Sequence, residues 1–105
     1  MKFIISSNSP KMWPKNEDFD LKVHHLTEEE FHALAYDGFS HIGHEDIAKI
    51  VNFAYNKTPV QVRIGDILLM AQKYRGVMKY YCMQVVENPN PLIREEELYI
   101  EEELI

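Results

Sequence analysis

The chain has 105 residues, 46% of them hydrophobic and 27% charged, with a formal net charge of −6. These values are typical of one small globular domain, spanning residues 1–105, and exclude a disordered chain. The acidic balance argues against a protein that coats long DNA or RNA, because such proteins carry a basic surface. No apolar run approaches the ~20 residues of a membrane-spanning helix, so we expect no membrane partner.

The N-terminal segment and the cysteine content indicate the cellular compartment in which the protein works. Phe3-Ile4-Ile5 is too short an apolar run for the core of a signal peptide. Cys82 is the only cysteine, which excludes an intrachain disulfide and a thiolate metal cluster. We therefore expect a protein of the reducing cytoplasm.

Much of the acidity lies in a C-terminal tail, residues 93–105. Arg94 is the only cation from that position to the end, so the charge before residue 94 is close to balanced. A small anionic ligand is compatible with this distribution, whereas a long polyanion is not. The six carboxylates of the tail are Glu95, Glu96, Glu97, Glu101, Glu102 and Glu103.

The first quarter of the chain predicts two strands. Phe3–Ser6 is a short apolar strand, followed by a loop of turn-forming residues over Ser7–Pro10. Leu21–Leu26 alternates roughly between apolar and polar residues and predicts the second strand.

Two helices follow. Thr27 and Glu30 form a capping box, which marks a helix start, and Gly38 is suited to the helix end. The second helix is expected to begin after Gly43 and to end at Asn56. Its apolar residues lie on one face because they are spaced by three and four positions. They are Ile47, Ile50, Val51 and Ala54.

The second half predicts three further strands. These are Thr58–Ile64, which alternates, Ile67–Gln72, which is almost wholly apolar, and Lys79–Val86. Gly65-Asp66 predicts a tight turn between the first two, and the tail suits either a helix or an edge strand. The expected fold is α/β: a mixed sheet of four or five strands packed with two or three helices in a single small domain.

The loop from Ser40 to Glu45 is the strongest candidate site. It places His44 beside the start of the second helix, where free N–H groups attract phosphate. An imidazole there can also donate a proton near neutral pH. Gly43 permits close backbone approach and Ser40 adds a hydroxyl. The alternative is a polar capping residue, and Glu45 would then simply complement the helix dipole.

Other candidates lie at strand ends. Arg75 follows an apolar strand beside Gly76, where a guanidinium can hold a phosphate, although a solvated loop arginine fits the pattern too. Arg63 alternates outward in its predicted strand. Asn8 and Ser9 follow the first strand and can bind a phosphate or a base edge, or can serve the turn alone.

A metal or another cofactor is not expected. His41 and His44 are three residues apart, but the pair straddles a glycine loop and has no third ligand nearby. His24, His25 and His32 suit surface or packing positions.

A family resemblance joins these candidates. Gly38–Glu45, followed by Ala48, resembles the Ser-x-Ile-Gly-His motif of the viral ring nucleases, anti-CRISPR proteins that disarm type III immunity. The other landmarks occur in the family's order over roughly residues 1 to 76. They are Asn8-Ser9, Arg63, Gly65-Asp66 and Arg75-Gly76.

The resemblance implies a function. Such a protein binds cyclic tetra-adenylate across a homodimer interface, in the host cell cytosol. It is a phosphodiesterase that cuts the ring without metal or cofactor, by attack of a ribose 2′-hydroxyl. His44 would be the general acid, and Arg75 would stabilise the phosphorane. The implied ligand-binding residues are Asn8, Ser9, Ser40, Ile42, Gly43 and Arg63.

Three departures from the family pattern keep alternatives open. Met78 stands where the family has a glutamate, and Ile47 where it has a threonine. The stretch between the second helix and Gly65-Asp66 is also shorter than is usual in the family. A protein that kept the pocket and lost turnover would sequester a cyclic nucleotide as a sponge. A second alternative is an acidic interaction protein that blocks a defence protein through its tail.

The sequence also gives an independent reason to expect a homodimer. One layer of this length does not easily cover an apolar strand surface. That surface comprises Tyr80, Tyr81, Met83 and Val85.

Overall fold

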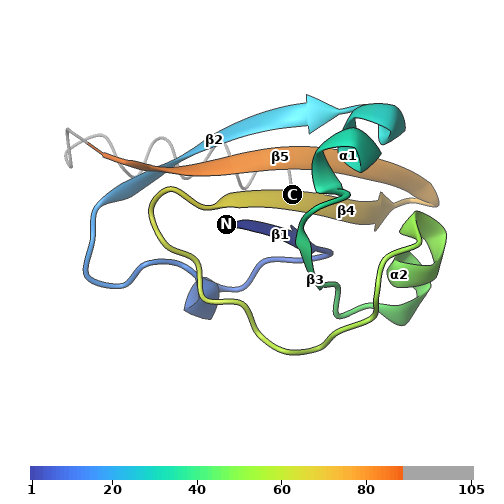
Figure 1. Cartoon of the computed structure of the whole chain (residues 1–105), viewed down its shortest axis with the longest axis horizontal. Coiled ribbons are helices and arrows are strands. Elements are labelled where there is room, and N and C mark those ends of the chain that lie inside the picture. The colour runs from blue at the N-terminus through green and yellow to red at the C-terminus, as the bar shows by residue number, and fades with distance from the viewer. Residues whose placement is uncertain (89–105) are drawn as a thin grey trace.

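A five-stranded mixed sheet forms the body of the protein, in a computed structural model that describes residues 1–88 (Figure 1). The strand order is β2-β5-β4-β1-β3, with β2, β5 and β4 antiparallel and β4, β1 and β3 parallel. This confirms the predicted α/β fold. The elements are β1 (Lys2–Ile5), a 3-10 turn (Pro10–Met12), β2 (Phe19–Leu26), α1 (Glu28–Ala35), β3 (Phe39–His41), α2 (Glu45–Val51), β4 (Ile67–Tyr74) and β5 (Val77–Glu87). The acidic tail, residues 93–105, lies outside the described residues.

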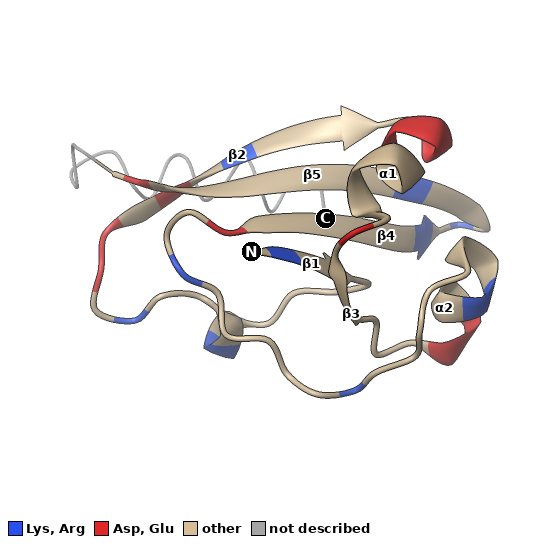
Figure 2. Ribbon diagram, in the orientation of Figure 1, with Lys and Arg blue, Asp and Glu red and all other residues tan. Residues whose placement is uncertain are grey.

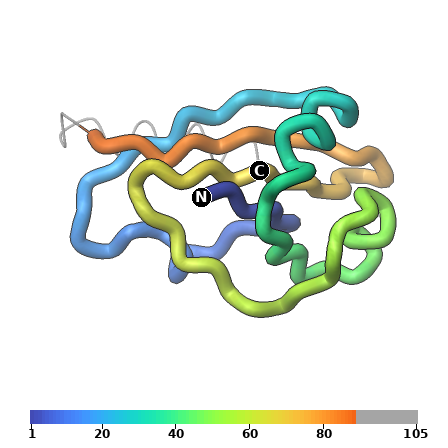
Figure 3. Tube along the Cα trace, viewed as in Figure 1, coloured from blue at the N-terminus to red at the C-terminus, as the bar shows by residue number. Residues whose placement is uncertain are grey.

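Each face of the sheet carries its own hydrophobic core. The helix face packs Phe31 of α1 and Val51 of α2 against Ile4 and Leu69 of the sheet. The other face, here the loop face, is covered by irregular segments (Figure 3). Each fully buried aliphatic or aromatic side chain stabilises the fold by about 1.5–3 kcal/mol. The segments on the loop face contribute Met12, Val60 and Val62.

The position of β1 determines where the loops meet. Ile5, its last residue, pairs with His41 of β3 on one side and with Met70 of β4 on the other. The three strands are parallel, so the loops that follow their carboxyl ends gather at one edge of the sheet. β4 continues to Tyr74, past the end of β1.

The first helix begins as predicted. Thr27 Oγ1 accepts a hydrogen bond from the Glu30 N–H at 3.1 Å, and Glu30 Oε1 accepts one from the Thr27 N–H at 2.9 Å. Gly38 follows the helix and has a packing role, because a Cβ there would lie 3.2 Å from Cγ1 of Ile4. The glycine therefore lets the chain pass close to β1 where β3 begins.

The second helix is shorter than predicted. It ends at Val51 rather than at Asn56, because Asn52 adopts the left-handed conformation with φ 62° and caps the helix. The Asn56 side chain instead donates to the Ser40 carbonyl at 2.9 Å. The last residue of the predicted apolar face, Ala54, therefore lies outside the helix.

Two other expectations about secondary structure were wrong. Thr58–Ile64 is not a strand, although its alternation is real, since Val60 and Val62 are buried on the loop face. The segment is bonded to the 3-10 turn through Val62 N–H and the Met12 carbonyl at 2.8 Å. Phe39–His41, expected as loop, is the edge strand β3. Three residues are too few to show a period of two.

The apolar surface that suggested a dimer is buried within one chain. Tyr80, Tyr81, Met83 and Val85 are each 8% exposed or less. A homodimer must therefore use another surface. No helix among residues 1–88 is long and apolar enough to cross a membrane.

Candidate functional site

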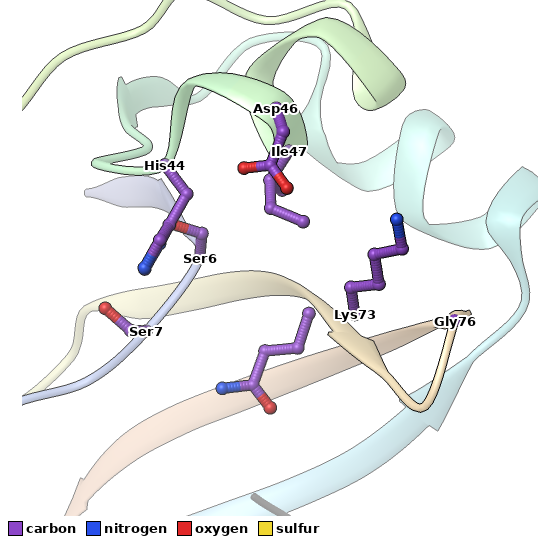
Figure 4. A pocket seen from close by; sticks show the side chains of 8 residues that line it. Ser6, Ser7, His44, Asp46, Ile47, Lys73 and Gly76 are labelled. Atoms are coloured by element: carbon purple, nitrogen blue, oxygen red, sulfur yellow. The ribbon is translucent and has the colours of Figure 1, made fainter.

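A shallow cleft of 570 Å³ opens at the sheet edge where the carboxyl ends of β1, β3 and β4 meet. Ligands of open α/β sheets commonly bind at such an edge. Figure 4 shows His44 and Lys73 on opposite sides of the cleft, with Ile47 between them. The lining residues are Ser6, Ser7, His44, Asp46, Ile47, Gln72, Lys73 and Gly76.

His44 is held by a residue far away in the sequence. Its Nδ1 lies 2.7 Å from Oγ of Ser6, a 5% exposed side chain directly after β1. His44 precedes α2 with an extended backbone, and its side chain does not cap the helix. The hydrogen bond occupies Nδ1, so Nε2 is the ring nitrogen available for a ligand in the cleft.

The two acidic residues at the start of α2 differ in their surroundings. Glu45 is exposed, and its carboxylate lies 3.8 Å from Lys49 one turn further on. Asp46 lines the cleft (Figure 4). The negative charge of Asp46 therefore opposes the binding of an anion close to His44.

Lys73 is a cleft residue that sequence reasoning missed. Successive residues of a strand point to opposite faces, and the inward-facing Leu69 and Ala71 of β4 pack on the helix face. Lys73 continues that series beyond the core and lines the cleft. Its charge partly offsets that of Asp46. Counting along β4 from Leu69 could have found it.

Arg75 lies at the turn that borders the cleft. Arg75 and Gly76 both have positive φ, 50° and 79°, and join β4 to β5 in a two-residue hairpin. The guanidinium carbon of Arg75 lies 5.3 Å from the centre of the Tyr74 ring. Gly76 lines the cleft, whereas Arg75, its neighbour in the turn, is not among the lining residues.

A second, smaller cleft of 160 Å³ lies on the loop face and collects several predicted ligand-binding residues. Asn8, Ser9, Gly43 and His41 line it. Ser7 lines both clefts. Two cations also line the smaller cleft, Lys11 of the 3-10 turn and Lys57 of the segment after α2. Figure 2 shows blue basic residues on both of these segments.

The two histidines of the loop do not form a pair. His41 lines the smaller cleft, and its Nδ1 lies 2.8 Å from the Thr58 carbonyl oxygen. His44 faces the larger cleft. Among residues 1–88, no three His, Cys, Asp or Glu side chains come together as a metal site.

Three other predicted ligand-binding residues stand apart from the larger cleft. The Ser40 hydroxyl donates to the Ala54 carbonyl and so holds the segment after α2. Ile42 is fully buried in the helix-face core. Arg63 lies before β4, near the opposite end of the sheet, and lines a separate open hollow there together with Glu17.

Cys82 offers no reactive thiol. It lies in β5 within the helix-face core. Burial raises the pKa of the Cys82 thiol, because the thiolate is poorly solvated there.

Comparison with known proteins supports the fold. No family model and no curated protein matches the chain. Among solved structures, the chain is similar to B116 of Sulfolobus turreted icosahedral virus, with a TM-score of 0.62. This chain has the fold of a viral protein. The match covers 79% of this chain and 97% of B116 at 17% identity, so the likeness is one of fold.

Proposed function

We propose that this protein is a viral ring nuclease that binds cyclic tetra-adenylate and cleaves it without a metal. The observation that carries the proposal is the hydrogen bond between Ser6 and His44 at the edge of an open cleft. It orients an imidazole toward a space that also holds the cation of Lys73. The Ser-x-Ile-Gly-His resemblance and the viral fold of B116 support the same reading.

The chemistry needs only groups of this chain and of the substrate. A ribose 2′-hydroxyl oxygen attacks the adjacent phosphorus, its proton passes to solvent, and the bond from phosphorus to the 5′-oxygen of the next nucleotide breaks. His44 Nε2 donates a proton to that leaving oxygen, which typically contributes about 10²–10⁴-fold in rate. The products end in a 2′,3′-cyclic phosphate and a 5′-hydroxyl.

Cations would stabilise the phosphorane. Lys73 lines the cleft, and Arg75 directly precedes the lining residue Gly76 in the hairpin turn. A rotation of the long Arg75 side chain toward His44 would bring a planar donor to the phosphate oxygens. Positive charge aimed at developing negative charge acts mainly in the transition state.

A homodimer would complete the site around a closed ring. A symmetric pair places two copies of His44 about one axis, which matches a ring of repeated nucleotides. Phe39 of the edge strand β3 and the nearby Tyr36 are 57% and 77% exposed. Aromatic side chains of this kind are common at protein interfaces.

One observation favours a sponge that binds the ring without cutting it. Met78, in place of the family glutamate, packs against the helix-face core beside the cleft. A thioether can neither accept the 2′-hydroxyl proton nor orient a donor. The protein would then act by binding the cyclic nucleotide tightly and cleaving it slowly or not at all.

A chromatographic assay tests the proposal. The protein is incubated with a panel of cyclic oligonucleotides, including cyclic tetra-adenylate, in the presence and absence of a chelator. We expect linear products ending in 2′,3′-cyclic phosphate from the tetra-adenylate ring, unaffected by the chelator and lost in His44→Ala. Tight binding without product would favour the sponge, and no binding of any ring would refute both. Activity lost on chelation and restored by zinc would overturn the metal-free mechanism.

A further inference from the structure

The β4–β5 hairpin projects beyond the neighbouring strands as a two-stranded arm, residues 72–79 (Figure 1). β1 ends opposite Met70, and β2 ends where Leu26 pairs with Tyr80. No other strand of residues 1–88 flanks the arm past these positions. The turn of the arm is exposed to solvent, while its strands continue into the core of the sheet.

The loop face of the arm combines exposed apolar side chains with cations. Tyr74 and Val77 pair across the hairpin and are 57% and 56% exposed. Lys79 is exposed on the same face, two residues after Val77 on β5. Arg75 stands in the turn, with its guanidinium over the Tyr74 ring. These four side chains, here the arm patch, include no acid, and no carboxylate of residues 1–88 forms an ion pair with the two cations.

The acidic tail, residues 93–105, has the complementary composition. In its sequence the apolar triplet Leu98-Tyr99-Ile100 stands between two acidic triplets, Glu95–Glu97 and Glu101–Glu103. The arm patch has the same order with the opposite charge. Arg75 at the turn and Lys79 toward the sheet enclose the apolar pair between them. Matched apolar groups flanked by opposite charges favour association of the two segments.

The tail is long enough to reach the arm patch within one chain. β5 returns from the arm to Glu87 over 11 residues. An extended chain of residues 89–105 covers more than that length. The covalent tether also raises the effective concentration of the tail at the arm above that of a separate protein.

We propose that the acidic tail binds the arm patch of its own chain and holds Arg75 over the Tyr74 ring. This placement agrees with the structure, in which Arg75 does not line the larger cleft. The consequence for activity rests on the proposed function. A guanidinium paired with tail carboxylates is not free to rotate toward a phosphate near His44, so the tail would act as an internal inhibitor of the site.

Paramagnetic relaxation locates the tail without any ligand. Ile105→Cys carries a nitroxide label, and the native Cys82 is buried, which protects it from labelling. We expect the amide signals of Tyr74 and Val77 to lose most of their intensity at low salt and to regain it at high salt. Loss confined to other residues, such as those of the smaller cleft, would overturn the inference. Equal loss when the label and the observed amides are on different copies would also overturn it.

Two charge reversals at exposed strand lysines test the arm patch directly. Lys79→Glu changes the patch, and Lys22→Glu changes β2 outside it and is the matched control. We expect the loss of amide signal to disappear in Lys79→Glu and to persist in Lys22→Glu. Disappearance in both variants would trace the contact to net charge and overturn the inference.

A neutral tail tests the consequence for the site. The neutral-tail variant combines Glu101→Gln, Glu102→Gln and Glu103→Gln. We expect it to bind cyclic tetra-adenylate about three- to fivefold more tightly at low salt, the effect of one exposed ion pair released. The difference should vanish when both tails are compared in Arg75→Ala.

The outcomes separate the tail contact from the proposed function. Equal affinities of the two tails in the presence of Arg75 would overturn inhibition by the tail. A difference that persists in Arg75→Ala would trace the effect to net charge and overturn it as well. Loss of amide signal at the arm patch in a protein that binds no ring would refute the proposed function and leave the tail contact standing.

Discussion

Lys73 and Met78 lie directly opposite each other across the β4–β5 hairpin and face the same side of the sheet. Side chains in such a pair have Cβ atoms about 4.5–5.5 Å apart. The position of the missing family glutamate is therefore beside a cleft cation. This relationship gives the sponge hypothesis a direct test.

Met78→Glu should raise single-turnover cleavage of cyclic tetra-adenylate by about tenfold or more, because it adds a proton acceptor beside the cleft. Val77→Glu is the matched control, since Val77 is 56% exposed and belongs to the opposite face. A rise of similar size in both variants would trace the effect to net charge. An unchanged cleavage rate in Met78→Glu would show that this hairpin takes no part in the reaction.

Ser6→Ala should slow cleavage by about tenfold while leaving the affinity for cyclic tetra-adenylate nearly unchanged, because Ser6 is almost fully buried and acts by orienting His44. Ser6→Thr keeps the hydroxyl and should restore most of the rate. The measurement is kcat and KM for the three proteins, with thermal unfolding to verify the fold. A large rise in KM alone would place Ser6 in ligand binding.

Asp46→Asn should tighten the binding of cyclic tetra-adenylate several-fold at low salt, because it removes a negative charge from the cleft. Glu45→Gln, at an exposed position paired with Lys49, should change affinity far less. Titration calorimetry at two salt concentrations measures both. Weaker binding by Asp46→Asn would identify the carboxylate as an acceptor for the ligand.

Arg75→Asn should stabilise the protein while weakening ring binding. A non-glycine residue with φ 50° is strained by about 1–2 kcal/mol, and asparagine before Gly76 is the favoured hairpin pair. We expect the free energy of unfolding to rise by roughly 0.5–1 kcal/mol. Arg75→Ala should lose binding without that gain. Urea denaturation measures the change in stability, and a binding assay measures the change in affinity. Unchanged ring binding in both variants would show that Arg75 does not contribute to the binding site.

Light scattering at micromolar concentration should find a homodimer. Phe39→Glu, on the exposed edge strand, should favour the monomer and reduce cleavage if the site is shared. Thr58→Glu, on the segment after α2, is an exposed control. A monomer for the unmodified protein would contradict the shared-site proposal.

Local signals in the sequence predicted most of the fold. The Thr27–Glu30 capping box and the apolar run from Ile67 appear where expected, because each depends on neighbouring residues. The segment Thr58–Ile64 was wrongly predicted as a strand. Alternating apolar and polar residues indicate an extended chain with one face buried, and they do so whether or not another strand pairs with it. β3 was missed because its stability comes from pairing with β1.

The sequence singled out the loop of the candidate site but not the residues around it. His44 lines a cleft, and its Ser6 partner is 38 positions away in the sequence, where no spacing rule reaches it. Lys73 was hidden because β4 was expected to end at Gln72. Arg63 matched the family order, yet it lies near the opposite end of the sheet from His44.

The central place of β1 has a consequence for biosynthesis. This strand is synthesised before its partner β4, so its ladder is complete only when Met70 has been made and can pair with Ile5. The cleft depends on the same pairing, because Ser6 and Lys73 come together only across β1 and β4. Parallel pairing of distant segments is slow compared with local contacts. Nascent chains that stop before β4 would therefore carry the His44 loop without a cleft, and binding activity should emerge late in synthesis.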